Sequence, residues 1–337
     1  MHPPYYFVTG GAGFIGSHLV HFLLAHTDAT VVNIDCLSYA SQPQALADVA
    51  DHPRYVFSHT DINDAASLAL LFERYPPLAV CHLAAESHVD NAIHSPQAFM
   101  HSNIQGTFTL LEATRQYWQG LGTEAQALFR FLHVSTDEVF GDLAHDAAPL
   151  SEGAAYRPSN PYSASKAASD HLALAWQRTY GLPVLLTHCT NNFGPWQHPE
   201  KLIPHMIDCA LAERRLPLYG DGGQSRDWLY VTDHVQALWT VLQHGQVGES
   251  YHISAQQERR NLDLVTQLCH LLDELRPRLV DQPYSGLIDL VTDRPGHDVR
   301  YALNSDKLKH TLGWRVDVDF DTRLRQTVAW YLEGRPA

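Results

Sequence analysis

The chain has 337 residues, 45% of them hydrophobic, which predicts about two domains with sizeable cores. Its formal net charge of −14 argues against nucleic acid or an anionic membrane as a partner, although local cations and helix N-termini can still bind a small anion. With no apolar run near the roughly 20 residues that span a bilayer, and no signal-peptide pattern, we expect a cytoplasmic protein.

The first predicted element is a buried strand over residues 5–9, followed by a glycine-rich turn and a helix with one apolar face. Gly10, Gly13 and Gly16 have the spacing that serves a tight turn, close approach of the backbone to a pyrophosphate, and close helix–strand packing. Ordinary strand–helix turns also carry glycine triplets, so this signal depends on its context.

The second strand, over residues 30–34, supplies that context. It ends at Asp35, about 20 residues after the last glycine, where an acid accepts hydrogen bonds from the adenosine ribose hydroxyls. Because a carboxylate there repels a 2′-phosphate, the sequence favours NAD over NADP.

A third strand is predicted over residues 55–59. Asp61 and Ile62 follow it and are well placed to flank an adenine ring. Asp61 could equally be the cap of the helix expected over 65–75, and the two interpretations are compatible.

A fourth apolar run covers residues 78–83, and the small residues Ala84 and Ala85 after it would let a dinucleotide approach the backbone. We then expect one helix from about 96 to 118. Its apolar face would consist of Phe99, Ile104, Phe108 and Leu111.

The central strand, over residues 129–134, is dense in aromatic and β-branched residues. It leads to Thr136, Asp137 and Glu138, a hydroxyl and two adjacent carboxylates. In a doubly wound sheet ligands bind outside the carboxyl ends of the strands, so we expect these three side chains to face a substrate.

A helix over about 161–180 carries Tyr162 and Lys166 on one face, because they are four residues apart. An ammonium group there favours a phenolate and predicts a lowered pKa for Tyr162, which would make it a general base. A phenol and two acids exceed what a simple alcohol dehydrogenase requires.

Alternating strands and helices predict an α/β fold, a Rossmann-like doubly wound parallel sheet with a smaller C-terminal α/β substrate lobe. The strand over 183–188 ends near Asn191 and Asn192, whose amides can orient a carboxamide or a sugar hydroxyl. We expect an NAD-binding domain over 1–190 plus about 230–255. A nucleotide-sugar-binding domain would cover about 191–229 plus 256–337.

The five cysteines form no CxxC pair, which indicates buried free thiols in a reducing compartment. His82, Glu86 and His88 lack the spacing of a zinc site, so we expect no metal.

Arg294 and His297 stand on a constrained turn suited to a diphosphate. Taken singly, such basic residues are equally well explained as surface charge.

Together these motifs resemble the dTDP-glucose 4,6-dehydratase family of the extended short-chain dehydrogenase/reductase superfamily. The matching segments cover nearly the whole chain in family order: 9–17 (TGGAGFIGS), 82–90 (HLAAESHVD), 135–143 (STDEVFGDL), 161–166 (PYSASK), 191–204 (NNFGPWQHPEKLIP), 226–230 (RDWLY) and 293–302 (DRPGHDVRYA). The glycine and Tyr-x-x-x-Lys motifs mark only the superfamily, whereas the Asp–Glu pair marks the dehydratases.

The resemblance implies dehydration of dTDP-glucose with bound NAD by a cytoplasmic homodimer, paired through helices near 100–118 and 162–180. Tyr162, supported by Thr136 and Lys166, would take the C4 hydroxyl proton. Glu138 would remove the C5 hydrogen, and protonated Asp137 would give its proton to the departing C6 hydroxyl.

The resemblance also implies binding residues. For NAD they are Gly10, Gly13, Phe14, Ile15, Gly16, Asp35, Leu37, Ser38, Asp61, Ile62, Leu83, Ala84, Ala85, Ser102, Tyr162, Lys166 and Asn192. For the nucleotide sugar they are Ser87, Thr136, Asn191, Lys201, Leu202, Pro217, Tyr219, Arg226, Asn261, Arg294 and His297.

Some positions depart from the family pattern, notably Asn91 in place of an arginine, Cys36 in place of a lysine and His252 in place of an asparagine. None of them removes a proton-transfer group. Three alternatives stay open: another nucleotide-sugar 4,6-dehydratase, a 4-epimerase, which needs the tyrosine but not the acid pair, and a non-catalytic NAD-sensing protein.

Overall fold

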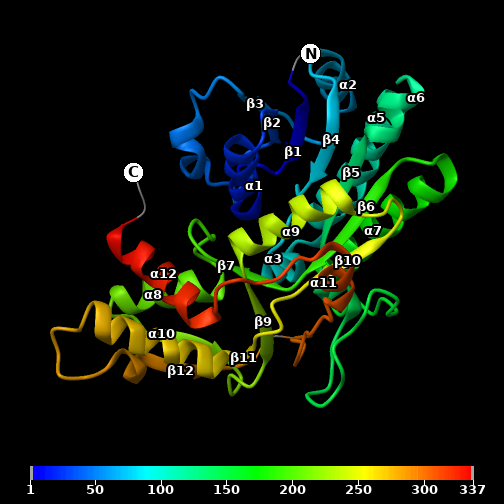
Figure 1. Ribbon diagram of the computed structural model, residues 1–337. Coiled ribbons are helices and arrows are strands. Elements are labelled where there is room, and N and C mark those ends of the chain that lie inside the picture. The colour runs from blue at the N-terminus through cyan, green and yellow to red at the C-terminus, as the bar shows by residue number, and fades with distance from the viewer. Residues whose placement is uncertain (1–2, 294, 335–337) are drawn as a thin grey trace.

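The computed structural model of the protein describes residues 3–293 and 295–334. A seven-stranded sheet with the order β10-β6-β5-β4-β1-β2-β3 forms its centre (Figure 1), and every neighbouring pair is parallel. The strands are β1 (Tyr5–Thr9), β2 (Thr30–Asp35), β3 (Tyr55–His59), β4 (Pro77–His82), β5 (Arg130–Thr136), β6 (Val184–Cys189) and β10 (Ser250–Ile253). The predicted Rossmann-like fold is confirmed.

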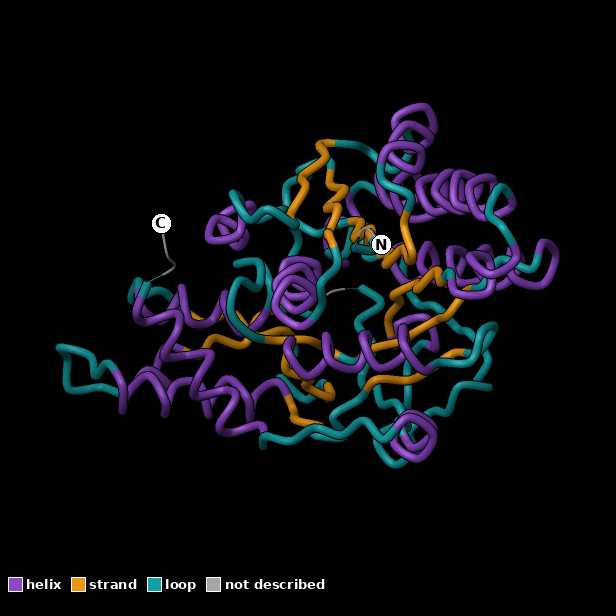
Figure 2. Tube along the Cα trace, turned by 45° about the horizontal axis from the view of Figure 1, so that its top comes forward, coloured by secondary structure: helices purple, strands orange, loops and turns teal. Residues whose placement is uncertain are grey.

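Helices cover both faces of this sheet (Figure 2). One face carries α1 (Phe14–His26) and α9 (Val231–His244), which contact each other. The other carries α2 (Ala65–Arg74), α5 (Thr107–Gln119) and α7 (Pro161–Tyr180). The layers follow from right-handed crossovers between parallel strands.

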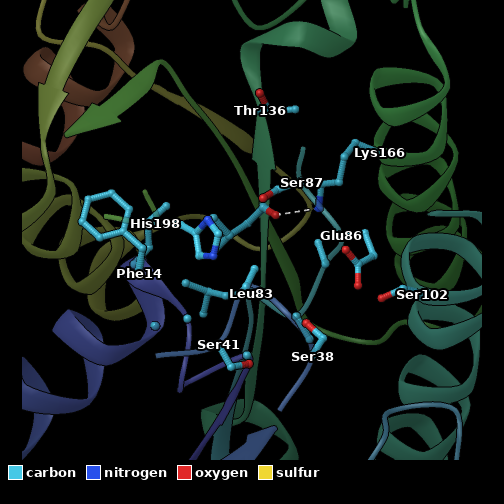
Figure 3. A pocket seen from close by; sticks show the side chains of 18 of the residues that line it. Phe14, Ser38, Ser41, Leu83, Glu86, Ser87, Ser102, Thr136, Lys166 and His198 are labelled. Atoms are coloured by element: carbon cyan, nitrogen blue, oxygen red, sulfur yellow. Dashed lines mark hydrogen bonds between the residues drawn. The ribbon is translucent and has the colours of Figure 1, made fainter. Parts of the chain in front are cut away.

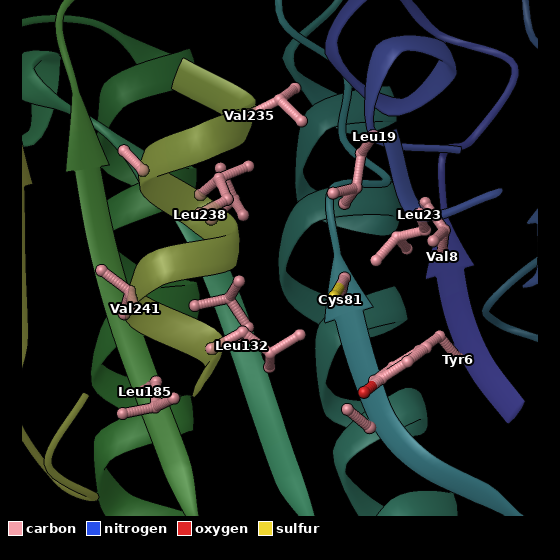
Figure 4. Close-up of a cluster of buried hydrophobic side chains, with 14 of the residues drawn as sticks. Tyr6, Val8, Leu19, Leu23, Cys81, Leu132, Leu185, Val235, Leu238 and Val241 are labelled. Carbon is pink, nitrogen blue, oxygen red and sulfur yellow. The ribbon is translucent and has the colours of Figure 1, made fainter. Parts of the chain in front are cut away.

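The period of two along each strand divides the core between these faces. Tyr6 and Val8 of β1 pack toward α1 and α9 with Leu132 of β5, Leu185 of β6 and the apolar stripe of α9 (Figure 4). The intervening Phe7 packs toward α2, α5 and α7. Because both faces are buried, the strands read as almost continuous apolar runs.

A second cluster of buried side chains lies among α8 (Leu202–Leu211), α10 (Asn261–Leu275) and α12 (Phe320–Glu333). A three-stranded sheet of β7 (Asn191–Phe193), β9 (Ser225–Tyr230) and β11 (Glu258–Arg260) borders it, as does the pair β8 (Leu216–Tyr219) and β12 (Ile288–Val291). The short helix α11 (Asp306–Leu312) packs instead on β10 and α9. The division into two domains stays a prediction.

The helix expected as one piece over about 96–118 is not uniform. It consists of α4 (Pro96–Phe99), a π-helical stretch (Met100–Gly106) and α5. Asn103 in the π-helical stretch bridges outward: its amide donates to Oγ of Ser165 (2.8 Å) and to the carbonyl of Glu86 (3.0 Å). Phe108 is expected on the buried apolar face, but it is 39% exposed, so that expectation is wrong. The change of helical period turns this residue away from the face.

The glycine turn gives the first testable prediction. A Cβ on Gly16 would lie 2.1 Å from the carbonyl oxygen of Gly10. A Gly16→Ala substitution must therefore move the glycine turn and the start of α1 apart. We expect the free energy of unfolding to fall by about 1–3 kcal/mol, as for other overpacked sites. Denaturant unfolding measures it. Gly153→Ala, where a Cβ meets nothing within 4 Å, is the matched control and should change it by less than about 0.5 kcal/mol.

Within residues 3–293 and 295–334, none of the helices combines the length and apolarity needed to traverse a lipid bilayer.

Candidate active site

The carboxyl ends of the central strands surround a cavity of about 430 Å³, within the range usual for small-molecule sites. Figure 3 shows Ser38 and Ser41 toward one end of the cavity and Thr136 and Lys166 toward the other. Segments that follow β1, β2, β4, β5 and β6 therefore contribute to one site, as a doubly wound sheet requires.

The glycine turn forms one wall. Gly10 adopts a φ of +69°, and a Cβ there would lie 2.7 Å from the backbone nitrogen of Ala84. The helix α1 begins next to it at Phe14, and no side chain of the described residues caps its first amides. Bare backbone and unpaired N–H groups at a helix N-terminus suit a pyrophosphate, so this wall fits the phosphates of NAD.

Asp35 lies buried at the end of β2 and holds the turn together. Its carboxylate accepts hydrogen bonds from the amides of Ala12 (2.9 Å) and Leu37 (2.8 Å) and from the hydroxyl of Ser41 (3.0 Å). The side chain lines the cavity, as a partner for ribose hydroxyls must. The cap of α2 is Asp64, which accepts from the amides of Ala66 and Ser67, so Asp61 is not the helix cap. Asp61 lines the cavity with Ile62.

The end of β5 places the two acids on a short 3₁₀ turn over residues 137–140. The Thr136 hydroxyl donates to Oδ1 of Asp137 (3.1 Å) and accepts from the amide of Glu138 (3.3 Å). Asp137 is 3% exposed, and its Oδ2 has no hydrogen-bond partner among the described residues. Burial, followed by the neighbouring charge of Glu138, raises the pKa of Asp137 well above its usual range. The pair therefore sets a carboxyl group that keeps its proton to a higher pH beside a second carboxyl group.

Tyr162 and Lys166 face the same cavity from α7. The expectation that Tyr162 has a lowered pKa because of Lys166 is wrong when the groups of the chain are considered. Burial, then the charge of Glu138 and the thiol of Cys189, raise that pKa well above 10.0. The Thr136 side chain acts the other way through a hydrogen bond, whereas Nζ of Lys166 donates to the carbonyl of Val134 (2.9 Å).

The two expected amides lie beside this group. Asn192 is held by its own contacts: its amide nitrogen donates to the carbonyl of Thr190 (2.9 Å), and Oδ1 lies 2.9 Å from Nδ1 of His234. Oδ1 of Asn191 is buried with no hydrogen-bond partner among the described residues. Both line the cavity, so Asn191 has an acceptor available for a ligand.

The structure gathers most of the predicted binding residues in this cavity. The expected NAD contacts line it, with the exception of Leu37, which is 39% exposed. Of the expected sugar-nucleotide contacts, Ser87, Thr136, Asn191 and Lys201 line it. The Lys201 ammonium donates to the carbonyl of Ser87 (2.9 Å).

The remaining sugar-nucleotide candidates lie outside the lining. They are Leu202 at the start of α8, Pro217 and Tyr219 on β8, Arg226 on β9, Asn261 at the start of α10, and His297. Arg226 donates to the carbonyls of Ser225 (2.7 Å) and Asp298 (2.8 Å) and lies over the ring of Tyr301. Arg294 falls outside the described residues. For all of these, ligand binding stays a prediction.

Sequence reasoning missed several lining residues, among them Ser41, Glu86, Gln197, His198 and Glu200. Glu200 accepts a hydrogen bond from the hydroxyl of Tyr39, and the amide of Gln42 donates to the carbonyl of Trp196. Two loops distant in sequence thus meet beside the cavity. No local pattern predicts such a contact, because it depends on how β2 and β7 are placed in space.

Comparison with known proteins gives a consistent result. The family model described as GDP-mannose 4,6 dehydratase matches residues 7–327. The chain is 52% identical to the dTDP-glucose 4,6-dehydratase of Shigella flexneri over 333 residues, which cover 96% of this chain and 92% of that protein.

Solved structures agree. The dTDP-glucose 4,6-dehydratase of Bacillus anthracis, crystallised with NAD, superposes with a TM-score of 0.86 at 38% identity and covers 98% of this chain and 97% of its own. The enzyme of Streptomyces venezuelae, also with NAD, gives 0.88 at 42% identity and covers 98% of both chains. UDP-glucuronic acid 4-epimerase of Bacillus cereus, at 24% identity and a TM-score of 0.86, shares the fold.

Proposed function

The chain belongs to the dTDP-glucose 4,6-dehydratase family, within the group described as GDP-mannose 4,6 dehydratase, and from this premise we propose how its residues dehydrate dTDP-glucose. The reaction is the NAD-dependent conversion to dTDP-4-keto-6-deoxyglucose, by C4 oxidation, loss of water across C5 and C6, and hydride return to C6. When bound, NAD supplies the hydride acceptor and donor, and its positively charged nicotinamide favours a phenolate in the same cavity.

One observation carries the assignment of roles: Asp137 is a buried carboxyl with a raised pKa, next to a second acid and in the same cavity as Tyr162. An elimination needs a base for the C5 hydrogen and an acid for the C6 hydroxyl at the same time. Groups with pKa values pushed apart by burial and like charge can supply both.

The protein's own groups act in sequence. Tyr162, whose pKa the Thr136 side chain acts to lower, takes the proton of the C4 hydroxyl. The C4 ketone acidifies the C5 hydrogen, which Glu138 removes. Asp137 then donates its proton to the departing C6 oxygen, and water leaves. Burial of Thr136, Asp137 and Tyr162 keeps solvent from the ketone and strengthens each charge.

The acid pair also separates this function from its nearest alternative. A 4-epimerase uses the tyrosine but has no water to eliminate, so a buried neutral carboxyl beside a second acid would have no task. An NAD-sensing protein would not need Tyr162 and Lys166 in the cavity.

The test is to incubate the purified protein with dTDP-glucose and weigh the product. Loss of one water supports the dehydratase, an unchanged mass with altered stereochemistry indicates an epimerase, and no reaction favours a sensor. With deuterium at C4 of the substrate, the label is expected at C6 of the same molecule. Washout to solvent would contradict the hydride return.

We further propose that the protein is a homodimer. Phe108 of α5 is 39% exposed and packs edge-on against Trp176 of α7, which in turn contacts Tyr180, 43% exposed. Such an exposed aromatic group on two adjacent helices suits a self-complementary interface. Sedimentation analysis of the protein and of a Phe108→Glu variant tests it, since the variant should be monomeric.

Residence in the cytoplasm is a further proposal. The five cysteines are free, and Cys81, Cys189, Cys209 and Cys269 are buried. Buried unpaired thiols suit a reducing compartment. Fractionation of cells that produce the protein would test it.

A further inference from the structure

Asp170 lies on α7, behind the candidate active site, and has no role in the mechanism above. Its carboxylate, fully buried, accepts hydrogen bonds from Nε2 of His133 (3.0 Å) and Oγ of Ser135 (2.9 Å) on β5. It also accepts from Nε2 of His188 (3.0 Å) on β6 and from the Tyr156 hydroxyl (3.1 Å), in the loop before α7. The group thus joins the strand that carries the two acids to the helix that carries the tyrosine.

The hydrogen bonds define the charge of this cluster. An ionised carboxylate only accepts, so Nε2 of His133 and of His188 each carry the proton. The Nδ1 atoms of both rings are buried with no partner among the described residues, and burial lowers the pKa of His133 to about 4. Burial alone would raise the pKa of Asp170, but the hydrogen bonds from His133 and His188 outweigh it and hold that pKa well below its usual range. Asp170 is therefore an ionised carboxylate behind the site.

Lys166, four residues earlier on α7, lies on the same face of the helix and contacts Val134, between the two β5 residues that bond Asp170. Lys166 is 5% exposed, and its ammonium donates to the carbonyl of Val134. Burial lowers the pKa of Lys166, whereas the charge of Asp170, and after it Cys189, raise it. The thiol of Cys189, on β6, has a pKa raised to about 12 by burial and carries no charge at neutral pH.

Two histidines near Lys166 add no competing positive charge at neutral pH. His82, on β4, has its pKa lowered well below 6.5 by burial, and burial lowers that of His133 to about 4. On the loop side, burial, followed by the charge of Asp170, raises the pKa of Tyr156 far above its usual range. The counter-charge for the buried ammonium is thus Asp170.

We propose that Asp170 is a positioning residue of the dehydration: its negative charge keeps Lys166 protonated, and its hydrogen bonds fix the end of β5 against α7. The inference rests on the proposed function for its catalytic consequence. The charge pairing rests on the buried contacts that both side chains make with residues 133–135 of β5.

An Asp170→Asn variant tests the charge. The amide keeps the size of the side chain but cannot act as a counter-charge, so Lys166 loses its proton at a lower pH than in the wild type. The resemblance assigns Lys166 to support Tyr162, and the ammonium is the form that can do so, so the alkaline limb of kcat against pH should move to lower pH. Where the shifted limb lies below pH 8, kcat measured at pH 8 should fall about tenfold for each pH unit between the two. KM for dTDP-glucose and NAD content should stay unchanged.

Tyr156→Phe is the matched control, because it removes one hydrogen bond to Asp170 and leaves the charge in place. Its alkaline limb should coincide with that of the wild type. If Asp170→Asn lowers kcat uniformly, without moving the limb, Asp170 only supports the structure and the inference is wrong.

A second measurement works without catalysis and without the asparagine variant. The lysines stand at positions 166, 201, 307 and 309, so ¹³C-lysine labelling gives few NMR signals. The ε-carbon of Lys166, assigned with a Lys166→Met variant, should keep the shift of an ammonium through pH 8. A neutral amine at pH 7 would overturn the pairing, whereas a wild type that leaves dTDP-glucose unchanged would overturn only the proposed function.

Discussion

An Asp137→Asn variant is expected to lose kcat by roughly 10²–10⁴-fold, the usual contribution of one general acid. The amide has no acidic proton to give to the C6 oxygen, so water cannot leave. Tyr162 and Glu138 remain, and C4 oxidation and C5 proton removal should continue reversibly. In deuterated solvent the recovered dTDP-glucose should therefore carry deuterium at C5.

Glu138→Gln is the control for that experiment, because it removes the proposed C5 base and keeps the acid. It should slow turnover to a similar extent, with no deuterium at C5. Exchange in the glutamine variant but not in the asparagine variant would show that the two roles are reversed.

The raised pKa of Asp137 also predicts a pH dependence of stability. In the unfolded chain this carboxyl ionises near 3.8, whereas in the folded protein burial and Glu138 hold its proton to a higher pH. Between these values the folded state binds more protons, so stability falls as the pH rises. Relative to Asp137→Asn, the wild type should lose unfolding free energy from about pH 4 toward pH 7, and denaturant unfolding at several pH values measures it.

The sequence predicts the site well where the pattern is local. The strand end at Thr136 and the helix spacing of Tyr162 and Lys166 depend on periods of two and of about 3.6, and a parallel sheet brings them to one edge. Asp35 follows from its distance along the same βαβ unit. These predictions need no knowledge of side-chain packing.

Two features of the site could not be predicted from the sequence and are seen only in the folded protein. The hydrogen-bonding role of Asn103 arises from a π-helical stretch that fits the helix to two neighbouring segments, and the sequence reads there as ordinary helix. The pKa of Tyr162 depends on how deeply α7 buries the phenol and on where Nζ of Lys166 points. Spacing predicts which residues share a face, but the sign of a pKa shift also depends on desolvation.

The same phenol gives the second large effect. A Tyr162→Phe variant should lose kcat by roughly 10²–10⁴-fold, because the C4 hydroxyl proton has no acceptor. The ring still packs edge-on against Phe99, so folding should be preserved. Unlike Asp137→Asn, this variant should take up no deuterium at C5, since C5 becomes acidic only after C4 is oxidised.

Tyr117→Phe is the matched control for this variant. It also removes a tyrosyl hydroxyl, one that donates to the carbonyl of Pro77 at a distance of 3.0 Å and lies outside the cavity. Its kcat should stay near that of the wild type. Deuterium at C5 in Tyr162→Phe would mean that another group deprotonates the C4 hydroxyl. Because the Thr136 side chain acts on the pKa of Tyr162, a Thr136→Val variant would then identify whether Thr136 takes over that role.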